Sequence, residues 1–85
     1  MSRYTRRAGK RDTLEPEIIA VAKKHGWDVE QLDNWDLQCH RNGWLLMVEV
    51  KTGNAKLTQS QQSLLDRGWP LRVIRTVEEA EELFR

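Results

Sequence analysis

The chain has 85 residues, of which 39% are hydrophobic and 32% are charged, and its formal net charge is +1. We expect one small globular domain of cytoplasmic location, because the length excludes a second core and no stretch has the apolar length of a membrane span or secretory signal. The single cysteine, Cys39, excludes an internal disulfide, and with His25 and His40 it supplies too few ligands to favour a zinc site.

The first eleven residues form a basic arm. They hold five cations and no acid: Arg3, Arg6, Arg7, Lys10 and Arg11. Such an arm suits a nucleic-acid backbone, because each contact between a cation and a phosphate releases condensed counterions. A solvated tail would have the same composition, so the pattern alone favours neither interpretation. Residues 12–85 are then the folded domain.

The domain is predicted to begin with a helix and a short strand. Residues 12–26 place apolar side chains at helical spacing, with Asp12 or Thr13 as the N-cap and Gly26 as the stop. Residues 27–32 alternate in the manner of a short edge strand.

A β-hairpin is predicted next. A turn around Asn34 leads into residues 35–40, and these residues and residues 44–50 flank the dipeptide Asn42-Gly43. Asn-Gly between two strand-like runs is the strongest short signal for a hairpin, so we expect two antiparallel strands.

The second half of the domain adds two helices and one strand. Residues 58–68 and 76–84 are the helices, and residues 70–75 are a β-branched strand between them. Each helix opens with a capping box: Thr58 with Gln61, and Thr76 with Glu79. The order α-β-β-β-α-β-α predicts an α/β fold with a mixed sheet, because a crossover through a helix returns the last strand parallel to its predecessor.

The hairpin register brings three charges to one patch. A two-residue turn makes Arg41 face Trp44, and counting outward places Asp36 opposite Glu49. Lys51 shares their side of the sheet, because side chains alternate along a strand. Facing carboxylates destabilise a hairpin by a few tenths to about 1 kcal/mol unless a cation lies between them. The patch therefore favours a metal ion.

The residue types on this patch indicate phosphoester hydrolysis. Carboxylates and a main-chain carbonyl are hard oxygen ligands of the kind that holds Mg2+, and a neighbouring ammonium can orient a phosphate or a water molecule. An isolated Glu-x-Lys is more often a surface ion pair. The interpretation therefore depends on Asp36 in register, on the apolar run that ends at Glu49, and on the order of elements.

With these features the chain resembles the PD-(D/E)XK nucleases, and among them the small virus-type replication-repair (VRR-NUC) nucleases. The resemblance covers roughly residues 17–83 and is carried by EII in the first helix, WDL at the acidic strand, VEVKTG, and KLTQSQ before the second helix. It implies a restriction-endonuclease-like α-β-β-β-α-β core and cleavage of DNA with Mg2+ or Mn2+ as cofactor.

The resemblance also implies roles for individual residues. It makes Asp36 and Glu49 the metal-binding acids, Val50 the donor of a carbonyl ligand, and Lys51 the catalytic lysine.

Two further matches have simpler alternatives. Glu17 matches the family's first-helix acid but also suits a helix N-terminus through the macrodipole. Gln61 matches a glutamine expected near the lysine and the phosphate, and its capping box explains it equally well. The family usually has proline before the strand acid, where this chain has Trp35. This difference leaves Asp33 as a rival for the role of Asp36.

These features together predict a metal-dependent DNA endonuclease, with duplex, flap, branched DNA and RNA all open as substrates in replication or repair. Two alternatives remain: a module of the same fold that binds nucleic acid without cutting it, and a structural subunit. The small core, the resemblance to nucleases that often act in pairs, and four tryptophans favour a homodimer. The tryptophans are Trp27, Trp35, Trp44 and Trp69.

Overall fold

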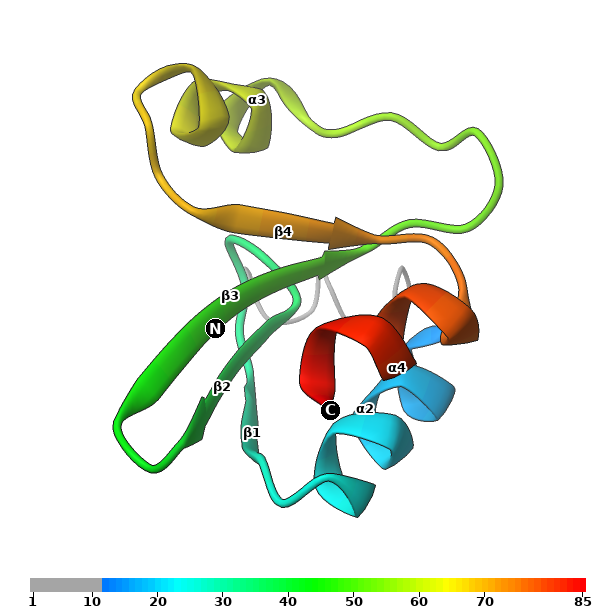
Figure 1. Cartoon of the computed structure of the whole chain (residues 1–85). Helices are drawn as coiled ribbons and strands as arrows, with labels where there is room; N and C mark the ends of the chain where they lie inside the picture. Colours follow the sequence, from blue (N-terminus) through cyan, green and yellow to red (C-terminus); the bar gives the residue numbers. More distant parts are fainter. Residues whose placement is uncertain (1–11) are drawn as a thin grey trace.

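A four-stranded mixed sheet forms the centre of residues 12–85, the part of the chain that the computed structural model describes (Figure 1). Its strand order is β1-β2-β3-β4, with antiparallel β1–β2 and β2–β3 pairs and a parallel β3–β4 pair. The elements are α2 (Glu15–Lys24), β1 (Asp28–Gln31), β2 (Leu37–Arg41), β3 (Trp44–Val50), α3 (Gln59–Asp66), β4 (Leu71–Ile74) and α4 (Val77–Phe84). The predicted fold class and the parallel last strand are confirmed.

The predicted basic arm lies outside the described residues. Its five cations are Arg3, Arg6, Arg7, Lys10 and Arg11. Within residues 12–85, no helix has the length and apolar character that crossing a bilayer requires.

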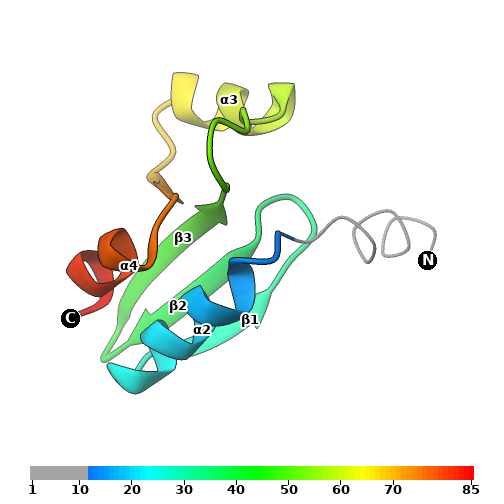
Figure 2. The same ribbon diagram turned by 90° about the vertical axis from the view of Figure 1, so that its right-hand side faces the viewer.

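Helices α2 and α4 cover one face of the sheet, whereas α3 lies apart from them beyond β4 (Figures 1 and 2). The core between the helices and the sheet comes from side chains at helical spacing in α2 and α4 and at alternate positions in the strands. Its most buried members include Ile18, Ala22, Leu37, Cys39, Val48, Val50, Ala80 and Phe84. One face of β2 and β3 therefore packs against the helices. The opposite face carries the side chains at the alternate positions, which include Glu49.

The β2–β3 hairpin has the predicted two-residue turn. Asn42 and Gly43 have φ values of 52° and 85°, the left-handed backbone that a tight hairpin turn requires and that Asn-Gly tolerates. Arg41 pairs with Trp44, and the ladder continues without a bulge to Leu37 and Val48. The predicted register is thus confirmed over the whole of β2.

Cys39 lies in the middle of this ladder opposite Leu46 and is 1% exposed. Burial, together with the nearby Asp28 carboxylate, raises the pKa of its thiol to about 11. Cys39 therefore stays protonated and packs as a small apolar side chain.

The first helix starts later than predicted. Leu14 occupies the N-cap position, and Asp12, two residues earlier, accepts a hydrogen bond from the Leu14 amide at 2.9 Å. Pro16 at the first helical turn fixes the start, because its ring sets a helical φ and lacks an amide hydrogen. The predicted stop at Gly26 is confirmed, with φ of 87°.

The two capping boxes differ from each other. The Thr58–Gln61 box is complete. In α4, Thr76 accepts from the Glu79 amide at 3.0 Å, but the Glu79 carboxylate accepts from the amide of Arg75 at 2.6 Å, one residue before the predicted donor. The Glu79 carboxylate therefore links the first turn of α4 to the residue that follows β4.

The C-terminal ends of α2 and α4 meet at one guanidinium group. Arg41 in β2 donates to the carbonyls of His25 at 2.9 Å and Phe84 at 3.0 Å, and its Cζ lies 4.5 Å from the ring centroid of Trp27. Trp27 Nε1 also donates to the Phe84 carbonyl, at 2.7 Å. These bonds satisfy carbonyls that a helix end leaves unpaired, so they join both helices to the sheet.

Candidate metal centre

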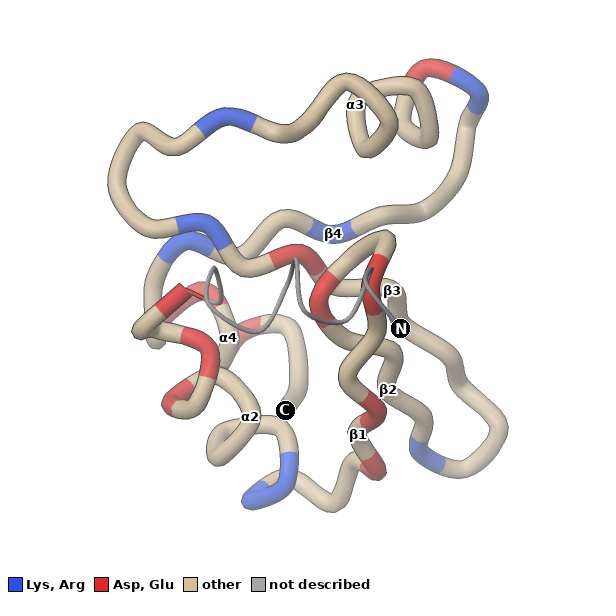
Figure 3. Tube along the Cα trace, turned by 180° about the vertical axis from the view of Figure 1, so that it is seen from behind, with Lys and Arg blue, Asp and Glu red and all other residues tan. Residues whose placement is uncertain are grey.

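The two acids of the predicted metal site meet where β2 begins and β3 ends. Asp36 directly precedes β2, and one further step of the Leu37–Val48 register brings it opposite Glu49. Asp36 is 3% exposed and Glu49 is 2% exposed. Figure 3 shows acidic segments, in red, gathered near these strand ends. Since carboxylates are rarely this buried without partners, the surroundings must supply hydrogen bonds or positive charge.

Each acid accepts a backbone hydrogen bond from the other strand. Glu49 Oε1 accepts from the Asp36 amide at 3.1 Å, and Asp36 Oδ2 accepts from the Val50 amide at 2.8 Å. Lys51 Nζ lies 3.2 Å from Glu49 Oε2, and its side chain is 16% exposed. The two amide donors and the ammonium supply hydrogen bonds and positive charge, which offset part of the cost of burying the two acids.

This donor set fits a magnesium-type ion. Mg2+ is usually held by one or two carboxylates and keeps several water molecules, and Asp36 and Glu49 provide two adjacent carboxylates. Among residues 12–85, no group of three or more His, Cys, Asp or Glu side chains is arranged to hold a metal. Two adjacent carboxylates with room for bound water are the donor set that a hydrated cation of this kind takes.

The two acids in the first turn of α2 differ in burial, and the predicted site role of Glu17 stays a prediction. Glu17 is exposed in the first turn, whereas Glu15 is 1% exposed and its Oε2 accepts from Gln31 Nε2 at 3.0 Å. Sequence reasoning did not single out Glu15. The available signal was its phase, because Glu15 lies three and seven residues before the core residues Ile18 and Ala22 on one helical face.

Gln61 is 2% exposed, and backbone partners engage both ends of its amide. Its Oε1 accepts from the Thr58 amide at 3.0 Å, and its Nε2 donates to the Asn34 carbonyl at 3.1 Å. Gln61 thus ties α3 to the loop that leads into Asp36. A contact between Gln61 and a substrate phosphate stays a prediction.

The alternative acid, Asp33, is half-buried in the same loop. Asp36 is the loop acid that bonds to the Val50 amide, and its own amide bonds to Glu49. Trp35, which precedes Asp36, is half-buried, and no hydrogen-bond partner for its indole nitrogen lies within the described residues. The contacts therefore favour Asp36 over Asp33.

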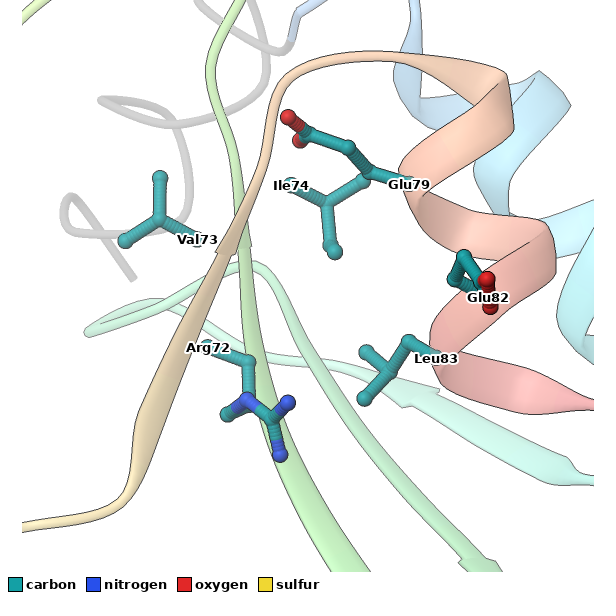
Figure 4. Close-up of a pocket in the computed structure, with 6 residues that line it drawn as sticks. All are labelled: Arg72, Val73, Ile74, Glu79, Glu82 and Leu83. Carbon is teal, nitrogen blue, oxygen red and sulfur yellow. The ribbon is translucent and has the colours of Figure 1, made fainter.

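Two hollows lie elsewhere, between α4 and the sheet. They measure about 290 and 400 Å³ and share Arg72, Glu82 and Leu83 in their walls. Figure 4 shows the first, with Glu79, Glu82 and Leu83 projecting from α4. Neither wall includes Asp36, Glu49 or Lys51. The paired acids are thus separate from both hollows.

No protein-family model matches the chain, and no curated protein or solved structure matches it. Membership of the PD-(D/E)XK nucleases therefore stays a prediction, which rests on the quoted motifs and the order of elements.

Asp36→Asn should stabilise the metal-free protein by a few tenths to about 1 kcal/mol, because it relieves repulsion between facing carboxylates and keeps an oxygen acceptor for the Val50 amide. Millimolar Mg2+ should raise the Tm of the wild type and leave that of the variant unchanged. Thermal unfolding with and without Mg2+ measures both effects. Asp66→Asn, at the exposed end of α3, is the matched control. A destabilised Asp36→Asn that still responds to Mg2+ would identify the pair as purely structural.

Proposed function

We propose that this chain is a metal-dependent nuclease that hydrolyses phosphodiester bonds in DNA. One observation carries the proposal: Asp36 and Glu49 are buried side by side, and Lys51 Nζ lies 3.2 Å from Glu49. A structural ion pair would need one acid and one base. Here a second buried acid lies beside the pair, and two adjacent carboxylates are a donor set that suits a hydrated divalent cation.

Asp36 and Glu49 would hold Mg2+ or Mn2+, with the carbonyl of Val50 as a further ligand. When bound, such an ion supplies an activated water molecule and stabilises the charge that develops on the leaving oxygen. The chain's own contribution is orientation. Backbone amides fix one oxygen of each carboxylate, and Glu49 holds the ammonium of Lys51 beside the pair. Lys51 then acts as a positive point charge that orients a phosphate or the attacking water.

The proposed substrate is DNA, with flap or branched forms in replication or repair as the narrower proposal. The resemblance to VRR-NUC nucleases supports that narrower form, and the five cations of the arm support a polyanionic partner.

Glu49→Gln should lower Mg2+-dependent cleavage of DNA by at least about a hundredfold, because it removes a ligand charge while it keeps an acceptor for the Asp36 amide. Lys51→Ala should lower kcat by a similar order and retain the stabilisation by Mg2+, since an ammonium does not bind the cation. Lys56→Ala, which is exposed in the following loop, serves as the control. Cleavage of labelled duplex, flap and branched DNA, with circular dichroism to verify the fold, measures these effects.

The same assay separates the alternative functions. Wild-type protein that binds DNA without cutting it in Mg2+ or Mn2+ would be a binding module of this fold. Metal-dependent cleavage that survives Glu49→Gln, with a destabilised metal-free fold, would contradict the assignment of these residues.

The basic arm should supply sequence-independent affinity for DNA. Deletion of residues 1–11 should weaken binding and flatten the plot of log affinity against log salt by about 0.9 for each phosphate that the arm neutralises. A full-length variant with glutamine at the five arm cations controls for length. Equal affinities and equal slopes in all three proteins would show that the arm does not bind phosphates.

We also propose a homodimer. Near the β2–β3 turn, Trp44 is 73% exposed and Leu45 is 61% exposed, and a second subunit could cover this apolar surface. Sedimentation at micromolar concentration should give about twice the chain mass of 10.0 kDa. Trp44→Ser should shift the protein to monomer, while Trp69→Ser, at a 48% exposed tryptophan, should not. A wild-type monomer with and without DNA would refute the dimer.

A further inference from the structure

Asp12 connects the start of α2 to the residue that follows Lys51. Its Oδ2 accepts from the Thr52 amide at 2.7 Å, and its Oδ1 accepts from the Thr52 hydroxyl and from the Leu14 amide at 2.9 Å. Asp12 and Thr52 are 40 residues apart in sequence. One carboxylate thus takes three hydrogen bonds and joins a helix start to the end of β3.

The bonds to Asp12 complete the support of the backbone around Lys51. The Lys51 amide donates to the Ile74 carbonyl at 3.0 Å, and the Thr52 amide donates to Asp12. The Gly53 carbonyl accepts from Arg75 Nη1 at 2.8 Å. Three successive residues are therefore each held by a bond to a distant part of the chain. The bonds made by the Asp12 carboxylate and the Arg75 guanidinium are charge-assisted and therefore stronger than bonds between neutral groups.

The charge of Asp12 also acts near Lys51. Although burial raises the pKa of the Asp12 carboxyl, the hydrogen bonds that it accepts and the nearby Lys51 ammonium hold it below its usual value. The carboxylate form is thus the one that the fold stabilises. The stability that ionised Asp12 adds to the fold is fully present above the ordinary aspartate pKa. It is lost as the pH falls through the lowered pKa of Asp12.

We propose that Asp12 is a positioning residue, which fixes the backbone at Lys51 and Thr52 so that the Lys51 ammonium stays beside Asp36 and Glu49. This inference rests on the proposed nuclease function. Asp12 is also the first residue after the basic arm, so the arm is joined to the domain beside the site.

Asp12→Ala, Asp12→Asn and Thr52→Val test the proposal, with Asp28→Ala as an exposed control on β1. Asp12→Ala should lower kcat by about tenfold or more and change KM by less than about threefold, because orientation and not binding is lost. Asp12→Asn should recover part of kcat, since its amide oxygen can still accept from the Thr52 amide. Thr52→Val should have no added effect in the Asp12→Ala background.

Amide hydrogen exchange supplies a readout independent of cleavage. In Asp12→Ala, exchange should rise at Lys51 and Thr52 and stay unchanged in the hairpin turn, and Asp28→Ala should change neither. An inactive wild type would contradict the nuclease. Unchanged exchange at Lys51 and Thr52, or a lower Tm with wild-type kcat, would overturn the role of Asp12.

Discussion

The reciprocal hydrogen bonds between Asp36 and the end of β3 are the constraint on which this region depends. Buried carboxylates are costly unless donors and positive charge surround them, and here the donors are backbone amides of the two strands themselves. These hydrogen bonds form only while the hairpin keeps its register. The same contacts fix the loop that Gln61 reaches from α3, so the position of that helix depends on them as well.

Much of the fold could be predicted from local sequence patterns such as turn dipeptides and caps. The Asn42-Gly43 turn specified the pairing of β2 with β3, because both residues accept left-handed backbone and a two-residue loop permits one register. Helix α2 began later than the sequence indicated. Asp12 was a reasonable N-cap by type, but its carboxylate bonds to Thr52, far along the chain, and no local pattern reports such a partner.

The candidate site could be predicted where it lies in the hairpin strands or directly beside them. Alternation along β3 and the hairpin register located Asp36, Glu49 and Lys51, since both follow from backbone geometry. The burial of Glu15 depends on how α2 packs on the sheet, and its partner Gln31 lies sixteen residues away. Gln61 was predicted only in part. Its bond to the Thr58 amide follows from the local capping box, but its bond to the distant Asn34 carbonyl depends on how α3 packs, which the sequence does not report.

The junction around Phe84 sets the order in which this domain can complete its fold during synthesis. Phe84 is fully buried, and its carbonyl accepts from Trp27 and Arg41, which the ribosome makes more than forty residues earlier. The core beside α2 is therefore incomplete until Phe84 has left the ribosomal exit tunnel and can pack against it. Until then, a nascent chain would hold a formed hairpin over an open apolar face, the kind of surface that chaperones recognise.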